Sequence, residues 1–227
     1  MSNVNPQLIL VQFCSIIISL TIHEFAHAYV ANAMGDPTPK RYGRLNLNPM
    51  TIIKAHPFGA LLIPIIGAFN GFLIGWAATP VNPHLVDRKY TLRQAERWIS
   101  LAGPLSNLIL AFLCAFLTLG LNALISLGGE LALWMEPLFV LSQVMVLTNI
   151  FLTLFNLIPI PPFDGFTIMS NTLPKELSHI PKMIEQYANI LILFAFVFGG
   201  RVLSPMIYSI SDTLFGIARW VLTPLLG

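Results

Sequence analysis

Residues 8–33 read Leu-Ile-Leu-Val-Gln-Phe-Cys-Ser-Ile-Ile-Ile-Ser-Leu-Thr-Ile-His-Glu-Phe-Ala-His-Ala-Tyr-Val-Ala-Asn-Ala, an apolar stretch interrupted near its end by His23, Glu24 and His27. A membrane-spanning helix needs about 20 mainly apolar residues, so this stretch is long enough to cross a bilayer. Ionisable side chains are expensive at membrane depth, where they mark functional sites. We therefore expect a membrane helix that carries chemistry towards its C-terminal end.

The composition of the whole chain is that of a membrane protein. Of its 227 residues, 56% are hydrophobic and only 10% are Asp, Glu, Lys or Arg, whereas a typical soluble domain is about 25% charged. Disordered chains are poor in apolar residues, so disorder is excluded as well. A net charge of +2 and the lack of a basic patch with interleaved aromatics argue against a nucleic-acid partner. These features predict a polytopic membrane protein.

Later stretches also have the length and apolarity of membrane helices, or nearly so, at about 98–127, 134–158, 184–199 and 202–223. The last two are short and are separated only by Gly199-Gly200-Arg201, which predicts a C-terminal helical hairpin over about 184–223. Together with 8–33, the first two are expected to form the core. The sequence thus predicts an all-α fold with about five transmembrane helices in a single membrane-embedded domain, 1–227.

One further stretch, at about 58–78, is long enough to cross but contains Pro64, Asn70 and two glycines near its middle. Such breaks are tolerated mainly where the backbone is buried in protein or lines a wet cavity. The loops on either side, 34–57 and 79–97, are both basic, and basic loops stay cytoplasmic. They can share one side only if the stretch dips in and returns, so we expect a re-entrant segment, with room for β structure within 40–78.

The remaining loops set the expected orientation. Loop 159–183 carries Lys175 and Lys182, whereas the connection at 128–133 has Glu130 and no Lys or Arg. The basic loops are expected on the cytoplasmic side. This predicts a multi-pass protein of the cell membrane, with its N-terminus outside and its site towards the cytoplasm.

The His23-Glu24-Phe25-Ala26-His27 run is an HExxH motif. Histidines spaced i, i+4 project from one helix face and can chelate one zinc ion, and the glutamate between them can reach a metal-bound water. The alternative is a hydrogen-bonded polar cluster that holds helices together. A catalytic zinc site needs a third protein ligand, and Asp164, which follows the prolines of 159–162, is the leading candidate. As a bare motif, an Asp-Gly after prolines is more often a surface turn.

The positions of these residues test whether Asp164 can share one metal ion with the two histidines. His23 and His27 lie in the C-terminal part of the first span, and Asp164 lies just past the C-terminal end of the 134–158 span. Both ends can meet at one metal only if the two helices run parallel, which requires an odd number of crossings between them. This again requires the 58–78 segment not to cross, in agreement with the charges.

These motifs resemble the site-2 protease family of intramembrane zinc metalloproteases, in particular its compact prokaryotic branch, which lacks PDZ and CBS domains. The resemblance covers nearly the whole chain. Besides the HExxH motif, it is carried by Gly43-Arg44-Leu45-Asn46-Leu47-Asn48-Pro49, Ala102-Gly103-Pro104-Leu105-Ser106-Asn107 and the segment from Asn156 to Gly165.

The resemblance implies one Zn²⁺ per chain, bound by His23, His27 and Asp164, with Glu24 as the catalytic base. It further implies that Gly103 and Asn107, a GxxxN element, contact substrate. Asn107 or Asn156 is also a candidate donor to the oxyanion. The implied substrates are single-span membrane proteins, cut in or near their transmembrane helices after another protease has trimmed them, as in regulated intramembrane proteolysis.

The sequence departs from the family pattern at one position and leaves two other functions open. His56 stands where this branch often has an acid; it is either a spare loop residue or a group that contacts the site from the re-entrant segment. The backbone of 41–49 or of 58–78 either caps the bundle or offers an edge for the unwound substrate. A membrane metal transporter and a catalytically inactive membrane scaffold are the alternative functions.

Overall fold

The structure is a computed structural model that describes residues 6–65 and 75–226. Its long helices are α1 (Pro6–Ala33), α5 (Leu92–Ser126), α6 (Glu130–Asn156) and α9 (Ala188–Leu226). Each contains a stretch long and apolar enough to cross a membrane. Within the described ranges every regular element is a helix, so the predicted all-helical, multi-pass fold is confirmed.

Short helices occupy the connections between the long ones. They are α2 (Thr38–Arg41), α3 (Pro49–Ala55), the π-helix η1 (Phe58–Leu62), the 3₁₀ helices η2 (Pro83–Leu85) and η3 (Lys175–Leu177), α7 (Asp164–Thr172) and α8 (His179–Gln186). Local signals explain where two of the helices begin. Asn48 accepts a hydrogen bond from the Met50 N–H at the start of α3, and Thr91 and Gln94 form a capping box at the start of α5.

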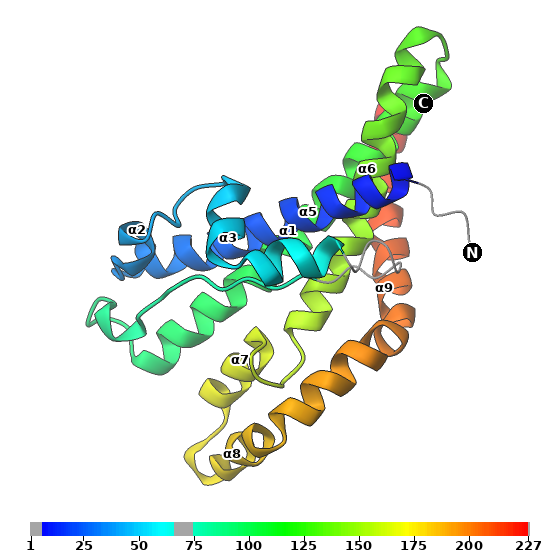
Figure 1. The fold of residues 1–227 in the computed structure, drawn as a ribbon. Coiled ribbons are helices and arrows are strands. Elements are labelled where there is room, and N and C mark those ends of the chain that lie inside the picture. The colour runs from blue at the N-terminus through cyan, green and yellow to red at the C-terminus, as the bar shows by residue number, and fades with distance from the viewer. Residues whose placement is uncertain (1–5, 66–74, 227) are drawn as a thin grey trace.

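The predicted C-terminal hairpin is wrong, because 184–199 and 202–223 belong largely to one continuous helix, α9. Gly199 stays helical and brings α9 close to Phe155, whose Cε2 would be 3.3 Å from a Cβ at that position. The glycine therefore provides room for helix packing and not a turn. Figure 1 shows α9 changing direction midway, as expected for a helix with an internal proline, here Pro205. The described residues accordingly contain four candidate spans, not five.

The middle of the predicted re-entrant segment, 66–74, lies outside the described residues. The two flanks of this part lie next to each other: the Trp76 N–H donates to the Gly59 carbonyl (2.9 Å), and a ring nitrogen of His56 lies 2.8 Å from the Ala78 carbonyl oxygen. The β structure allowed for within 40–78 is not found in the described part, which forms α2, α3 and η1. Helix is favoured there because Pro49 occupies a first-turn position, where its missing N–H is not needed.

Close contact between α1, α5 and α6 forms the centre of the bundle. Small buried residues such as Ala28, Ala31 and Ala111 let the helices approach, and the Ser15 hydroxyl donates to Thr148 across the α1–α6 contact (2.8 Å). Figure 1 shows α5 and α6 running side by side to a shared tip, with the C-terminal end of α9 next to them. This packing brings the second half of α1 against the first half of α5, where the site lies.

Candidate metal centre and active site

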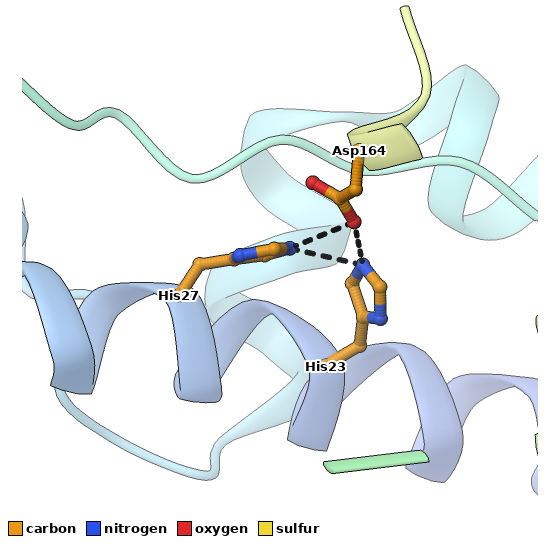
Figure 2. Close-up of side chains that lie close together, drawn as sticks. All are labelled: His23, His27 and Asp164. Atoms are coloured by element: carbon orange, nitrogen blue, oxygen red, sulfur yellow. Dashed lines mark hydrogen bonds and ion pairs between the residues drawn. The ribbon is translucent and has the colours of Figure 1, made fainter. Parts of the chain in front are cut away.

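Three side chains converge on one point between α1 and α7 (Figure 2). His23 and His27 come from successive turns of α1, and Asp164 is the first residue of α7. The two Nε2 atoms are 3.0 Å apart, and Oδ2 of Asp164 lies 3.3 Å from Nε2 of His23 and 3.4 Å from Nε2 of His27. Among the described residues, this is the one group of three or more such side chains arranged to hold a metal ion.

The triangle formed by these atoms has the size of one face of a zinc tetrahedron. With ligand distances of about 2.0–2.1 Å, a regular tetrahedron places its ligand atoms about 3.3 Å apart. The three observed separations of 3.0, 3.3 and 3.4 Å lie close to that value. Three protein ligands leave a fourth position open, which is the arrangement of catalytic zinc sites.

The hydrogen bonds of the two Nδ1 atoms determine the tautomers of both histidines. Nδ1 of His27 lies 2.6 Å from the carbonyl oxygen of Ile99, which can only accept, so Nδ1 carries the proton in the neutral ring. Nδ1 of His23 lies 2.6 Å from Oδ1 of Asn107, and the same assignment follows. Both Nε2 atoms therefore present lone pairs to each other and to a carboxylate. Three lone pairs at this separation repel unless a cation lies between them, so the residues fit a bound metal ion.

Asp164 is held in place by the residue before it. Phe163 is buried in a cluster with Phe155, Ala195 and Leu203, which anchors the start of α7. Burial on its own raises the pKa of Asp164. When a proton and not a metal ion lies between these atoms, the charge of His27 and hydrogen bonds from both imidazoles outweigh burial and lower the pKa from 3.8 to about 2. Asp164 is therefore a carboxylate, the form that binds metal.

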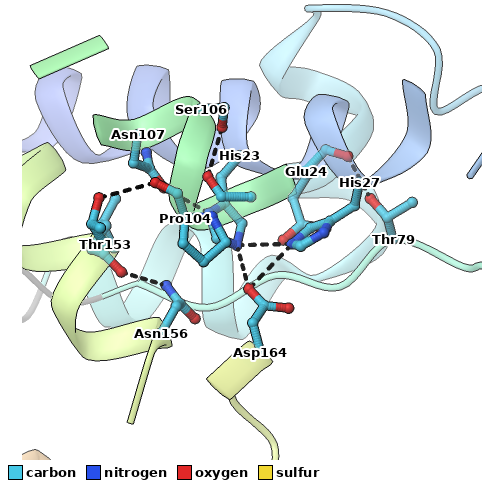
Figure 3. A network of polar contacts seen from close by, with 12 residues as sticks. His23, Glu24, His27, Thr79, Pro104, Ser106, Asn107, Thr153, Asn156 and Asp164 are labelled. Carbon is cyan, nitrogen blue, oxygen red and sulfur yellow. Dashed lines mark hydrogen bonds and ion pairs between the residues drawn. The ribbon is translucent and has the colours of Figure 1, made fainter. Parts of the chain in front are cut away.

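Glu24 lines the same cavity as His23, His27 and Asp164, a space of 190 Å³ that also contacts Trp76 and Asn156. Its side chain is buried, and its Oε2 has no hydrogen-bond partner among the described residues. The Thr79 hydroxyl donates to the backbone carbonyl of Glu24 (3.1 Å), as Figure 3 shows. The unpaired oxygen of Glu24 thus lies in the cavity of the three side chains that could hold a metal.

Gly103 and Asn107 lie on the face of α5 that packs on the histidines. A Cβ at Gly103 would be 2.5 Å from Cε1 of His23, so this position has no room for a side chain. Asn107 is fully buried, and its Nδ2 donates to the Ser19 carbonyl (3.2 Å) and to Oδ1 of Asn149 (2.7 Å). Both residues contact the histidines, and both amide protons of Asn107 are already hydrogen-bonded.

Asn156 and His56 are placed differently. Asn156 lines the catalytic cavity, and its Nδ2 donates to the Leu152 carbonyl one turn back (2.9 Å), which leaves its second amide proton available. His56 is outside the metal cluster; it packs edge-on against Trp76, with ring centroids 5.4 Å apart. It therefore contacts a residue of the cavity wall and is not a ligand.

Asn149 and Thr153 belong to the polar network around the site, and neither residue was predicted from the sequence. Asn149 supports Asn107, and the Thr153 hydroxyl donates to the Pro104 carbonyl (3.1 Å), as seen in Figure 3. Together with Asn156 they follow the spacing i, i+4, i+7, which places them on one face of an otherwise apolar helix. This pattern can be read from the sequence. The Ile99 carbonyl cannot, because any residue supplies one.

Comparison with known proteins agrees with this site. The sequence matches the family model of peptidase family M50 over residues 11–127 and 123–200. It is 38% identical over 216 residues to "Putative zinc metalloprotease YwhC" of Bacillus subtilis (strain 168), which covers 93% of this chain and 92% of the relative.

Two mycobacterial proteins named "Putative zinc metalloprotease Rip2" are also similar. The one from Mycolicibacterium smegmatis is 31% identical over 179 residues, covering 78% of this chain and 62% of the relative. The one from Mycobacterium tuberculosis H37Rv is 30% identical over 206 residues, which is 90% of this chain and 70% of the relative. No solved structure matches the chain. The chain belongs to peptidase family M50, the site-2 protease family, and is a membrane zinc metalloprotease with Zn²⁺ as its cofactor.

Proposed function

We propose that this protein hydrolyses peptide bonds in or near the transmembrane helices of single-span membrane proteins, after another protease has trimmed them, as in regulated intramembrane proteolysis. The observation that carries the proposal is the position of Glu24. It lies buried, with an unpaired Oε2, in the same cavity as His23, His27 and Asp164. A site that only stored or carried metal would have no use for a base that is not a ligand.

The roles of the side chains follow from this arrangement. Zinc held by His23, His27 and Asp164 would polarise the scissile carbonyl and lower the pKa of a water molecule towards about 7. Glu24 accepts the proton of the attacking water and later delivers it to the leaving amine. Asn107 and the Ile99 carbonyl hold the two imidazoles in the tautomer that keeps Nε2 free. Gly103 lets α5 pass close to both rings.

Asn156 is the better candidate for the oxyanion donor. It lines the cavity and retains an amide proton, whereas both protons of Asn107 are bonded within the bundle. A preorganised amide can stabilise charge that develops on the carbonyl oxygen. Asn107 is then a residue that positions His23, and the GxxxN element acts through the metal ligands.

The substrate must be unwound to be cut, because a membrane helix has its backbone groups bonded internally. Residues 75–82 have no helical structure, and Trp76, Ala77 and Thr79 line the cavity. The N–H groups of Ala77 and Thr79 have no partner among the described residues. These two N–H groups are candidate partners for the backbone of an unwound substrate, as in strand addition. An Ala77→Pro variant with unaltered cleavage would exclude this role.

We further propose that the protein lies in the cytoplasmic membrane with its N-terminus outside and its site towards the cytoplasm. The contact between Gly59 and Trp76 supports a re-entrant 58–78 segment, because the chain returns to the place where it left. With this segment re-entrant, the basic loops before and after it share the inner side. Four spans then place the C-terminal end of α9 outside.

Zinc analysis together with cleavage of a reporter helix in proteoliposomes tests the function. Wild type should bind one Zn²⁺ and cleave the reporter. Transport of metal without cleavage would favour the carrier, and zinc binding with neither activity would favour an inactive scaffold.

A further inference from the structure

A second cavity lies beside the catalytic one, between the start of α5 and helices α7 and α8. Its volume is 460 Å³, and its lining includes Glu96 and Ser170. Both cavities are bordered by α5 and α7: on α5, Ile99 and Ser100 line the catalytic cavity one turn after Glu96, and on α7, Asp164 precedes Ser170. This second cavity, here called the flanking groove, is therefore a neighbour of the catalytic cavity along α5 and α7.

Two polar groups in the flanking groove lack partners. The Ser170 hydroxyl oxygen is buried and has no hydrogen-bond partner among the described residues. Glu96 is half-buried and forms none of the ion pairs found in the described part of the chain. By contrast, the Arg93 guanidinium donates to the Leu173 carbonyl (2.9 Å), and Lys182 is exposed. A buried donor without a partner is costly, so the pair points to a ligand that offers an acceptor and a positive charge.

We propose that the flanking groove binds the cytosolic juxtamembrane segment of the substrate, with Glu96 pairing a Lys or Arg side chain and Ser170 donating to a backbone carbonyl. This inference rests on the proposed function and its orientation. The chemistry of the two partners matches, because cytosolic flanks of membrane helices are enriched in Lys and Arg. Glu185 and Lys182, both exposed, also line the groove and carry opposite charges, so the preference rests on Glu96.

Helix geometry sets the register of the contact. Glu96 and Gly103 lie on one face of α5, two turns and about 10 Å apart, and Gly103 lies against both imidazoles. An extended peptide advances about 3.3 Å per residue. A basic residue about three positions from the scissile bond, on its cytosolic side, therefore reaches Glu96.

Three reporter helices that differ only at this position, with Lys, Gln or Glu, test the proposal. Wild type in phosphatidylcholine vesicles should cleave the Lys reporter with a kcat/KM roughly tenfold above that of the Glu reporter. Glu96→Lys should reverse this order, and Ser170→Ala should raise KM for all three with zinc content unchanged. Glu176→Lys, in the exposed η3 outside the groove, is the matched control and should keep the wild-type order.

Several outcomes would overturn the proposal. Equal cleavage of the three reporters by wild type would show that the groove does not recognise the charge of the substrate flank. The same conclusion would follow if Glu96→Lys kept the wild-type order of reporter preference. A preference for the Lys reporter that appears only with phosphatidylglycerol in the vesicles would assign it to attraction between the reporter flank and the anionic membrane surface, and not to the groove. Failure of the proposed function looks different, because zinc-loaded wild type would then cleave no reporter, including one truncated before the flank.

Discussion

Gly103 lies so close to His27 that a Cβ atom on it would be 2.6 Å from Cε1 of the ring and closer still to Nε2. Helix α5 thus passes His23 and His27 at backbone distance. Ordinary van der Waals contacts begin at 3.4 Å, so any side chain at this position must displace the two imidazoles or the helix.

We expect Gly103→Ala to lose zinc affinity by at least the about 10–100-fold that changes around metal ligands cost. Metal analysis after dialysis against a zinc buffer measures this. Gly120→Ala is the matched control, because it lies on the same helix and its Cβ would meet no atom within 4 Å. Equal zinc retention in the two variants would contradict the close packing.

Glu24→Gln separates catalysis from metal binding. The change is nearly isosteric and removes no hydrogen bond from Oε2, which has no partner among the described residues. Zinc content should stay at the wild-type value, while kcat falls about 10²–10⁴-fold, the usual contribution of a general base. Normal turnover in this variant would eliminate the proposed role.

Asp164→Ala tests the third ligand. The variant removes Oδ2 from the face formed with the two Nε2 atoms, so zinc affinity should fall by more than the about 100-fold that outer-shell changes cost. Competition with a chromogenic chelator gives the affinity directly. An unchanged stoichiometry and affinity would mean that a different side chain completes the site.

Asn107→Ala and Asn156→Ala should fail in different ways. Without Asn107, His23 loses the acceptor for its Nδ1 proton, so zinc affinity should drop about 10–100-fold. Without Asn156, zinc should remain bound and kcat should fall by about 10²–10³-fold, as for loss of an oxyanion donor. Reversed results, with zinc lost only in the Asn156 variant, would exchange the two roles.

This site could be predicted from the sequence because ionisable side chains are energetically costly inside a membrane and are therefore rare there. His23, Glu24 and His27 interrupt an apolar helix, and the requirement that Asp164 meet them at one metal constrains the topology of the whole chain. The structure brings His23, His27 and Asp164 together at the distances that a metal needs. Long apolar segments and the spacing i, i+4 are local signals, and local signals can be read from one sequence.

The features that could not be predicted depend on contacts between distant segments. Gly199-Gly200 is compatible with a turn or with a close helix contact, and the choice is made by Phe155, which lies in a different helix. Similarly, Gly103 matched a substrate-contact motif, although its surroundings are the two imidazoles. The acceptor of the His27 Nδ1 proton is a backbone carbonyl, which leaves no mark in the sequence.

Topology mapping tests the continuity of the C-terminal helix α9. After Cys14 and Cys114 are replaced by alanine, single cysteines at Lys40, Lys175, Leu127 and Thr223 can be labelled from either side of sealed vesicles, since all four side chains are exposed. Lys40→Cys and Lys175→Cys should react from the cytoplasmic side and Leu127→Cys from the outside. One continuous α9 carries Thr223→Cys to the outside as well, whereas a hairpin returns it to the cytoplasm. Labelling of Lys40→Cys and Lys175→Cys from opposite sides would contradict the proposed metal centre, because the first span and the segment before Asp164 could not then meet at one ion.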